Sequence, residues 1–282
     1  MLQYSAIQWL FFFYFYCFFG WCFESAYVSI CKRKLVNRGF MKGPFLPLYG
    51  SGAIMMLVVS APFRDNIVLT FLAGVVGATI LEYVTGLVME TIFKVRYWDY
   101  SGQLLNFQGR ICLTSSLAWG GLTILMTRVV HQYVERVMLW IPSELLTVFV
   151  IVLTAYITAD FALAFKEAID LRDMLMKAEQ LKEEVAHLQK RLDVVIAVTV
   201  EDLRNKKEEF REELELYIED TKLDAAAKKE VIEKKLRTAL AEKQNRAVEI
   251  TTNTKKRLSK VLKANPGMKS VYFRFWDEWK KH

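Results

Sequence analysis

The sequence predicts an all-helical protein, a polytopic membrane helix bundle of about five spans followed by a long cytoplasmic coiled-coil tail. Hydrophobic residues make up 53% of the 282 residues, but charge is unevenly spread. Residues 1–165 hold only 11 of the 38 Lys and Arg and 8 of the 31 Asp and Glu. The first part can therefore enter a bilayer, whereas the charge-dense second part is typical of solvated helices. We expect a transmembrane bundle over residues 1–165, a cytoplasmic helical coiled coil over 166–264 and an aromatic and basic segment over 265–282.

Five segments are apolar over a length that approaches the ~20 residues needed to cross a bilayer. They are Ile7–Cys31, Pro47–Phe63, Ile67–Glu90, Ile111–Val130 and Leu145–Phe165. The second is short, and Pro47, Gly50 and Gly52 interrupt its start, so it is the weakest of the five. The first has no basic residue before it and no small-residue cleavage pattern, which favours a retained span over a signal peptide.

The distribution of basic residues predicts the orientation. The four loops between the spans carry five, one, three and two Lys or Arg, and a basic tail begins at Lys166. Basic residues concentrate on the cytoplasmic side, so we expect the N-terminus outside and the C-terminus in the cytoplasm, with the membrane crossed several times. The net charge of +7 suits anionic lipid headgroups better than nucleic acid, for which we expect no role.

Acidic residues inside the spans are the main candidates for function, because a charge at mid-bilayer costs ~2.5–3.5 kcal/mol on insertion scales. Counted at 1.5 Å per residue, three acids from three spans reach a similar cytoplasm-facing depth. One interpretation is a polar vestibule that binds a cation, a proton or a basic group. The other is that each acid is held by a polar neighbour for packing specificity. The vestibule would comprise Glu24, Glu82, Glu90, Asp160, Ser115 and Ser116.

The loop between the third and fourth spans, RYWDYSGQLLNFQGRIC, is unusually rich in aromatic and polar residues. Its aromatic residues suit the membrane interface, and Arg110 is placed to pair with Glu90 or Asp99. We therefore expect a structured lid over the acidic level, or a docking loop for a partner. The residues that define this lid or docking loop are Trp98, Asp99, Tyr100, Asn106 and Arg110.

Motifs for catalysis and nucleotide binding are missing from the sequence. The pattern GxxxxGK[ST] does not occur, so the chain does not supply its own P-loop ATPase. No HExxH, GxSxG or paired Cys/His pattern occurs, and the four cysteines lie in or beside apolar runs. We accordingly predict no metal, no cofactor and no catalytic residue, which disfavours an enzyme without excluding one.

The tail lacks Gly and Pro from Lys166 to Ala264, which favours long helices. Apolar residues recur at alternating spacings of three and four from Leu171 to Val195, a heptad seam typical of a coiled coil. Capping patterns within 199–224 divide the tail into three or four helices, either continuous or folded into hairpins. Asn265-Pro266-Gly267 should end the last helix. The aromatic and basic stretch 272–279 favours either the membrane surface or a fold back onto the coiled coil.

Four motifs occur together and in order along the first half of the chain. They are GWCFES, NRGFMKGPFLPLYGSG, LEYVTGLVMETIF and WDYSGQLLNFQGRICLTSSLAWG. In these motifs, residues 8–140 resemble the bacterial membrane family of ABC-transporter type IV proteins, or ABC transporter permeases. The resemblance implies a permease-like membrane protein, without a substrate or catalytic residues to carry over. The coiled-coil tail lies outside the resembling region.

Three functions follow from these observations. The first is a permease-like component that works with a separate ATPase docking on Lys32–Gly43 and Arg96–Arg110, and that forms a homo-oligomer through the Leu171–Val195 heptads. The second is a membrane-anchored coiled-coil scaffold or sensor. The third is a membrane enzyme, for which no nucleophile or metal set is visible.

Overall fold

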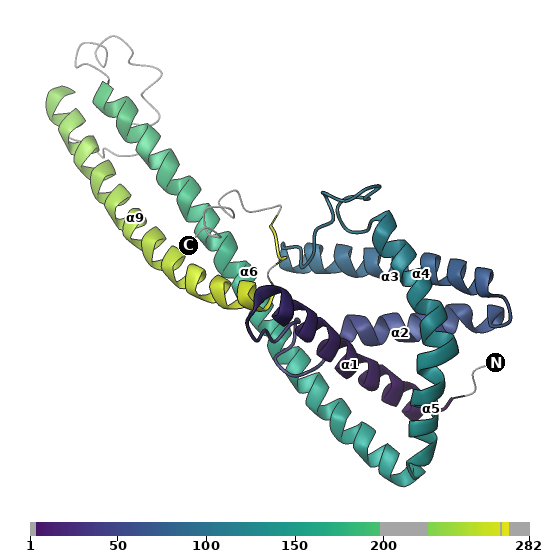
Figure 1. The fold of residues 1–282 in the computed structure, drawn as a ribbon. Coiled ribbons are helices and arrows are strands. Elements are labelled where there is room, and N and C mark those ends of the chain that lie inside the picture. The colour runs from purple at the N-terminus through teal and green to yellow at the C-terminus, as the bar shows by residue number, and fades with distance from the viewer. Residues whose placement is uncertain (1–3, 198–224, 266, 271–282) are drawn as a thin grey trace. The chain divides into compact units, whose positions relative to one another are not determined.

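The computed structural model describes residues 4–197, 225–265 and 267–270, and throughout these residues the chain is helical with short connecting loops. The predicted all-helical class is confirmed. Figure 1 shows the arrangement of the helices. They are α1 (Ala6–Lys32), α2 (Pro47–Ser60), α3 (Ile67–Phe93), α4 (Leu113–Leu125), α5 (His131–Trp140), α6 (Ser143–Ala197) and α9 (Ala225–Ala264), with a 3-10 turn at Ala61–Phe63 and a π-helical turn at Met126–Val130.

Four helices in the described part of the chain are long and apolar enough to cross a membrane. They are Ala6–Lys32, Ile67–Phe93, Leu113–Trp140 and Ser143–Ala197. The second predicted span forms a shorter apolar helix, Pro47–Phe63. The protein is therefore a membrane protein by the length and composition of its helices, while the predicted count of five crossings and their orientation stay predictions.

Helix α2 is short because it begins beside the middle of α1 rather than at the level where α1 ends. Proline occupies its first position, and the preceding Leu46 is extended. The backbone amide of Leu46 donates to the carbonyl of Cys17, 3.0 Å away. Irregular backbone at membrane depth is stable only where protein buries it. Gly50 allows this close packing, because a Cβ there would lie 2.7 Å from the carbonyl oxygen of Phe13.

Helices α4 and α5 form one bent helix joined by the π-helical turn, so the fourth predicted span ends at Trp140, ten residues later than expected. A single π turn inside a helix is a local insertion that is often found at functional sites. Helix α4 packs closely on α3, since a Cβ on Gly74 would overlap Thr123. The N-terminus of α4 is capped by Cys112, whose sulfur accepts from the amide of Ser115 at 3.4 Å.

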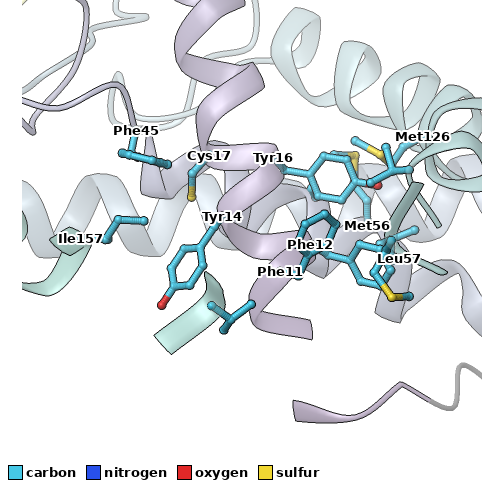
Figure 2. Close-up of a cluster of buried hydrophobic side chains, with 14 of the residues drawn as sticks. Phe11, Phe12, Tyr14, Tyr16, Cys17, Phe45, Met56, Leu57, Met126 and Ile157 are labelled. Atoms are coloured by element: carbon cyan, nitrogen blue, oxygen red, sulfur yellow. The ribbon is translucent and has the colours of Figure 1, made fainter. Parts of the chain in front are cut away.

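The main hydrophobic core lies between α1, α2, the π-helical turn, α5 and α6. The aromatic run of α1 contributes much of it, as Figure 2 shows. Tyr16 and Phe12 point toward the methionines Met56 and Met126, whereas Tyr14 points away from them. The hydroxyl of Tyr14 donates to Thr154 at 2.8 Å. The aromatic run therefore serves helix packing over most of its length, and Phe18 and Phe19 at its end are exposed.

The chain divides into two compact units, one with the described residues up to Arg172 and from Leu258 onward, the other running from Asp173 to Arg257. In the second unit, α6 and α9 run antiparallel and bury a small apolar cluster. Its members are Leu192, Leu236 and Leu240, flanked by Val185, Leu188, Val195 and Ile232. Of the two arrangements left open for the tail, this corresponds to the hairpin. Helix α6 is continuous through residue 165, where we expected the bundle to end.

The remaining tail expectations fall in two groups. Helix α9 ends at Ala264, as Asn265-Pro266-Gly267 predicted. Thr251–Thr254, a sequence that disfavours helix, nevertheless lies inside α9, where the hydroxyls of Thr252 and Thr254 donate to carbonyls one turn earlier. The capping patterns within 199–224 and the aromatic stretch 272–279 lie outside the described residues.

Candidate functional site

The acids of the predicted vestibule do not share one set of partners. Each carboxylate is buried or half-buried and bound by its own donors, which come from different loops and helices.

Glu90 lies in the last turn of α3 and is 3% exposed. Its carboxylate accepts from two arginines of the following loop. Arg96 donates through Nε at 3.0 Å and Nη2 at 3.2 Å, and Arg110 through Nε at 3.0 Å. Gly86, one turn earlier, leaves room for the Arg110 side chain. Nη1 of Arg96 also lies 3.8 Å from Oδ1 of Asp99, which in turn binds Lys269. Three cations therefore face two anions, and the cluster carries a net positive charge.

Glu82 lies two turns deeper on α3 and is 5% exposed. Its Oε1 accepts from the hydroxyl of Tyr100 at 3.0 Å, and its Oε2 from the Ser115 hydroxyl at 3.2 Å and the Trp119 indole at 3.0 Å. These three donors are neutral groups. Ser116, also expected in the vestibule, instead accepts from Thr79 at 2.8 Å. The Glu82 carboxylate is thus bound by hydroxyl and indole donors, whereas the Glu90 carboxylate is bound by arginines.

Glu24 of α1 combines the two kinds of partner. Its Oε1 accepts from Nε of Arg38 at 3.4 Å and its Oε2 from the hydroxyl of Tyr49 at 3.0 Å. Asp160 of α6 accepts from the backbone amide of Gly43 at 2.8 Å. A Cβ at position 43 would lie 2.9 Å from that carboxylate, so the contact requires glycine. Glu24 and Asp160 therefore both hold parts of the loop between α1 and α2.

The loop between α3 and α4 is internally ordered. The indole of Trp98 donates to the Arg110 carbonyl at 2.9 Å. The side-chain amide of Asn106 donates to two carbonyls of its own loop, and its oxygen accepts from the Gly109 amide. Leu105, with φ 49°, has a left-handed backbone that is uncommon for such a residue. All five residues expected to define a lid or docking loop thus belong to one hydrogen-bonded segment.

Asp99 links this loop to the end of the chain. Its carboxylate accepts from Lys269 Nζ at 2.7 Å and from the hydroxyl and amide of Ser101. Burial of the carboxyl opposes its ionisation, but the hydrogen bonds from Lys269 and Ser101 outweigh burial and lower the pKa of Asp99 to about 2. Asp99 is therefore a carboxylate at any physiological pH.

The described residues 265 and 267–270, which we call the C-terminal segment, lie against both loops. Arg38 donates to the side-chain oxygen of Asn265 at 2.9 Å. Lys269 and Arg96 exchange two backbone hydrogen bonds of 2.8 and 2.7 Å, and Met268 is 1% exposed. This long-range docking was missed from the sequence, because no local pattern specifies which distant loop a short segment will bind.

The buried polar group around His131 was also not predicted from the sequence. His131, directly after the π-helical turn, is 2% exposed, and its Nδ1 lies 2.8 Å from the hydroxyl of Tyr16. Its Nε2 lies 3.1 Å from the hydroxyl of Tyr4, which in turn donates to Glu135. Because Tyr4 donates to Glu135, it accepts from His131, which places the histidine proton on Nε2. A lone histidine in an apolar helix gave no spacing signal for these contacts.

Within the described residues, no group of three or more His, Cys, Asp or Glu side chains is arranged to hold a metal ion. The four cysteines are unpaired thiols. The polar interior is therefore built from hydrogen bonds and ion pairs.

Comparison with known families adds the decisive observation. Residues 11–165 match the family model described as "Putative ABC-transporter type IV". The chain belongs to the ABC-transporter type IV family. No curated protein and no solved structure matches the chain. The match to the ABC-transporter type IV model includes all the acids discussed above and both loops, whereas the C-terminal segment and α9 lie beyond it.

Proposed function

We propose that this protein is the permease-like membrane component of an ABC-type transporter and that a separate subunit hydrolyses ATP. Membership of the ABC-transporter type IV family and four apolar helices of membrane-spanning length support a membrane transport role. The sequence contains no P-loop of its own, so energy from ATP would have to come from a partner.

The observation that carries this proposal is the joint surface formed by the two loops. The ring of Phe40, from the loop after α1, packs on Phe93 and on Tyr97 of the loop after α3, with centroids 5.5 and 6.0 Å apart. The Glu90 cluster fixes the second loop on α3. A surface that is fastened to two helices through aromatic contacts and ion pairs suits a subunit that must transmit motion into them.

An exposed apolar patch on the second loop suits a docking contact. Leu104, Leu105 and Phe107 are 73%, 71% and 54% exposed. Hydrogen bonds from Asn106 hold the backbone of this part of the loop, which keeps the three side chains of the patch exposed. Exposed apolar groups rimmed by polar residues commonly mark interaction sites.

Affinity purification of the tagged full-length protein from its own membranes in mild detergent tests this proposal. We expect an ATPase subunit to be recovered, and Leu104→Ser to reduce its recovery. Leu139→Ser is the matched control, because Leu139 is 66% exposed on α5 and far along the chain from either loop. Failure of the wild-type protein to recover an ATPase would contradict the proposal.

We further propose that two copies associate, since four long helices are few for a transport pathway. The predicted self-association used the whole seam from Leu171 to Val195. In this chain the Val185–Val195 part of the seam packs on α9 of the same molecule, so it is not free to pair with a second copy. A contact between copies would use the remaining seam or the apolar faces of the membrane helices.

The alternative function is a membrane-anchored scaffold or sensor. The hairpin of α6 and α9 favours it, because this hairpin extends beyond the family match and presents charged faces. The same purification distinguishes the two functions. Recovery of a soluble structural partner that is lost on deletion of residues 173–257, with no ATPase, would favour the scaffold.

A further inference from the structure

The two hairpins α1–α2 and α3–α4 share an unexpected set of details. Helices α1 and α3 are both 27 residues long. Each ends at a basic residue with left-handed backbone, Arg33 with φ 50° and Lys94 with φ 59°. Each is followed by an irregular loop and by a second helix that packs back on it. Such hairpins are common, so the similarity becomes informative only at the level of individual side chains.

The buried carboxylates occupy matching positions in the two hairpins. In the first, Oε2 of Glu24 accepts from the Tyr49 hydroxyl at 3.0 Å. In the second, Oε2 of Glu82 accepts from the Trp119 indole at 3.0 Å. In both cases the acid lies on the first helix, and the donor is an aromatic ring near the start of the second helix.

The residue after each ring donor is glycine, Gly50 in the first hairpin and Gly120 in the second. Neither position has room for a Cβ, which would lie within 2.7 Å of side-chain or backbone atoms of the first helix. The obstructing residues lie seven and eleven positions before the carboxylate in both hairpins: Cys17 and Phe13 in the first, Val75 and Phe71 in the second.

The loops match at their ends. An arginine follows each carboxylate by fourteen residues, Arg38 in the first hairpin and Arg96 in the second. A glycine with positive φ precedes each ring donor by ten residues, Gly39 with φ 138° and Gly109 with φ 69°. They are the two glycines with positive φ in the described part of the chain. Arg38 and Gly39 are adjacent, whereas twelve residues, 97–108, separate their counterparts.

We infer that α1–α2 and α3–α4 are two copies of one helix–loop–helix unit, in which Glu24 and Glu82 are equivalent positioning residues for the second helix and residues 97–108 are an insertion. The two sides of this insertion approach each other near its ends, because the backbone amide of Tyr100 donates to the carbonyl of Gly109 at 2.8 Å. This inference concerns the construction of the core and holds whichever function the protein has.

The departures from equivalence have physical causes. Helix α2 starts one turn later than α4 because Pro44 and Pro47 disfavour a helix there. The position eight residues after the carboxylate is Lys32 in the first copy and Glu90 in the second. Arg38 therefore pairs with Glu24, whereas Arg96 is drawn to Glu90. The insertion compensates, since it supplies the Tyr100 hydroxyl to Glu82.

Exchange of the ring donors tests the equivalence of the two acids. Trp119→Phe and Tyr49→Phe keep a ring but remove the donor, so we expect each to lower the thermal midpoint of the full-length protein in detergent by ~2–4 °C. Trp119→Tyr and Tyr49→Trp install the other copy's donor, and at least half of the loss should be recovered. The equivalence would be overturned if, in both copies, the thermal midpoint of the exchange variant were no higher than that of the phenylalanine variant.

Deletion of the insertion tests the second half of the inference. Joining Arg96 directly to Gly109 reproduces the Arg38–Gly39 junction of the first copy. We expect the shortened protein to insert, to purify as a single species and to keep its helical circular dichroism, with a lower thermal midpoint from loss of the Tyr100 and Asp99 contacts. The control removes twelve residues, 33–44, from the first loop and should yield no folded protein. Equal failure of both deletions would contradict an insertion at 97–108.

Discussion

Glu90 and Glu82 lie eight residues apart on the same helix and are equally buried, yet their surroundings are opposite. Two arginines bind Glu90 in a cluster with net positive charge. Tyr100, Ser115 and Trp119 bind Glu82 through neutral donors. The comparison teaches that burial alone does not tell how much a carboxylate matters to stability, because the charge left behind on its removal decides the penalty.

The largest expected effect comes from Glu90→Gln. This change removes the carboxylate that the Arg96 and Arg110 guanidinium groups share and leaves Asp99, 3.8 Å from Arg96, as the remaining counter-charge. The free energy of unfolding should therefore fall by about 3 kcal/mol. Denaturant unfolding in detergent micelles measures it. Glu144→Gln is the matched control, because Glu144 is exposed at the start of α6, and it should change stability by less than about 0.5 kcal/mol.

Glu82→Gln should have a smaller effect in the same measurement. The amide keeps an acceptor oxygen for one group of donors, and no buried cation loses its partner, so we expect a loss of about 1–2 kcal/mol. A loss that equals or exceeds that of Glu90→Gln would break the comparison, because it would mean that neutral donors hold the carboxylate as strongly as arginines do.

Tyr100→Phe sharpens the comparison by removing one neutral donor from Glu82. We expect a loss of about 1 kcal/mol, the net value of a single hydrogen bond. Tyr133→Phe provides the control, because Tyr133 is 62% exposed. The effect of Tyr100→Phe should also shrink when it is combined with Glu82→Gln, and strict additivity of the two changes would show that the hydroxyl acts elsewhere.

The smallest effect concerns Asp99, whose pKa falls from 3.8 to about 2 on folding. A lowered pKa stabilises the folded state above the unfolded value and is lost as the pH falls through the folded value. The difference in thermal midpoint between wild type and Asp99→Asn should therefore be constant from pH 8 to pH 5 and disappear as the pH falls from about 4 to 2. Because the Lys269 side chain is 56% exposed, the ion pair should contribute less than about 1 kcal/mol to the free energy of unfolding. A difference that persists to pH 2 would argue against the ion pair.

Local patterns in the sequence were sufficient for much of the fold. Apolar run lengths predicted the long helices, and Asn265-Pro266-Gly267 predicted the end of α9. Counting along α3 and its loop put Arg110 within reach of Glu90. The heptad seam of α6 was visible too, but heptad spacing is the same whether the partner helix belongs to the same chain or to another. The sequence therefore could not decide between a hairpin and a dimer.

Contacts that depend on depth rather than on spacing could not be predicted. Tyr49 reaches Glu24 only because α2 starts beside the middle of α1, and Pro47 marks a helix start without giving its level. The acids were expected at one shared level, but their partners come from separate loops. The docking of Lys269 on Asp99 joins residues 170 positions apart, and one such pair leaves no periodic trace in a sequence.

The position of the C-terminal segment has a consequence for the order in which the protein is completed. Ribosomes make residues 265–270 only after both loops and the apolar helices α1 to α5. Arg38 and Asp99 therefore cannot bind Asn265 and Lys269 until more than 150 further residues have been synthesised. A chain that terminates before Asn265 would contain the whole family region and yet lack the residues that fasten its two loops together.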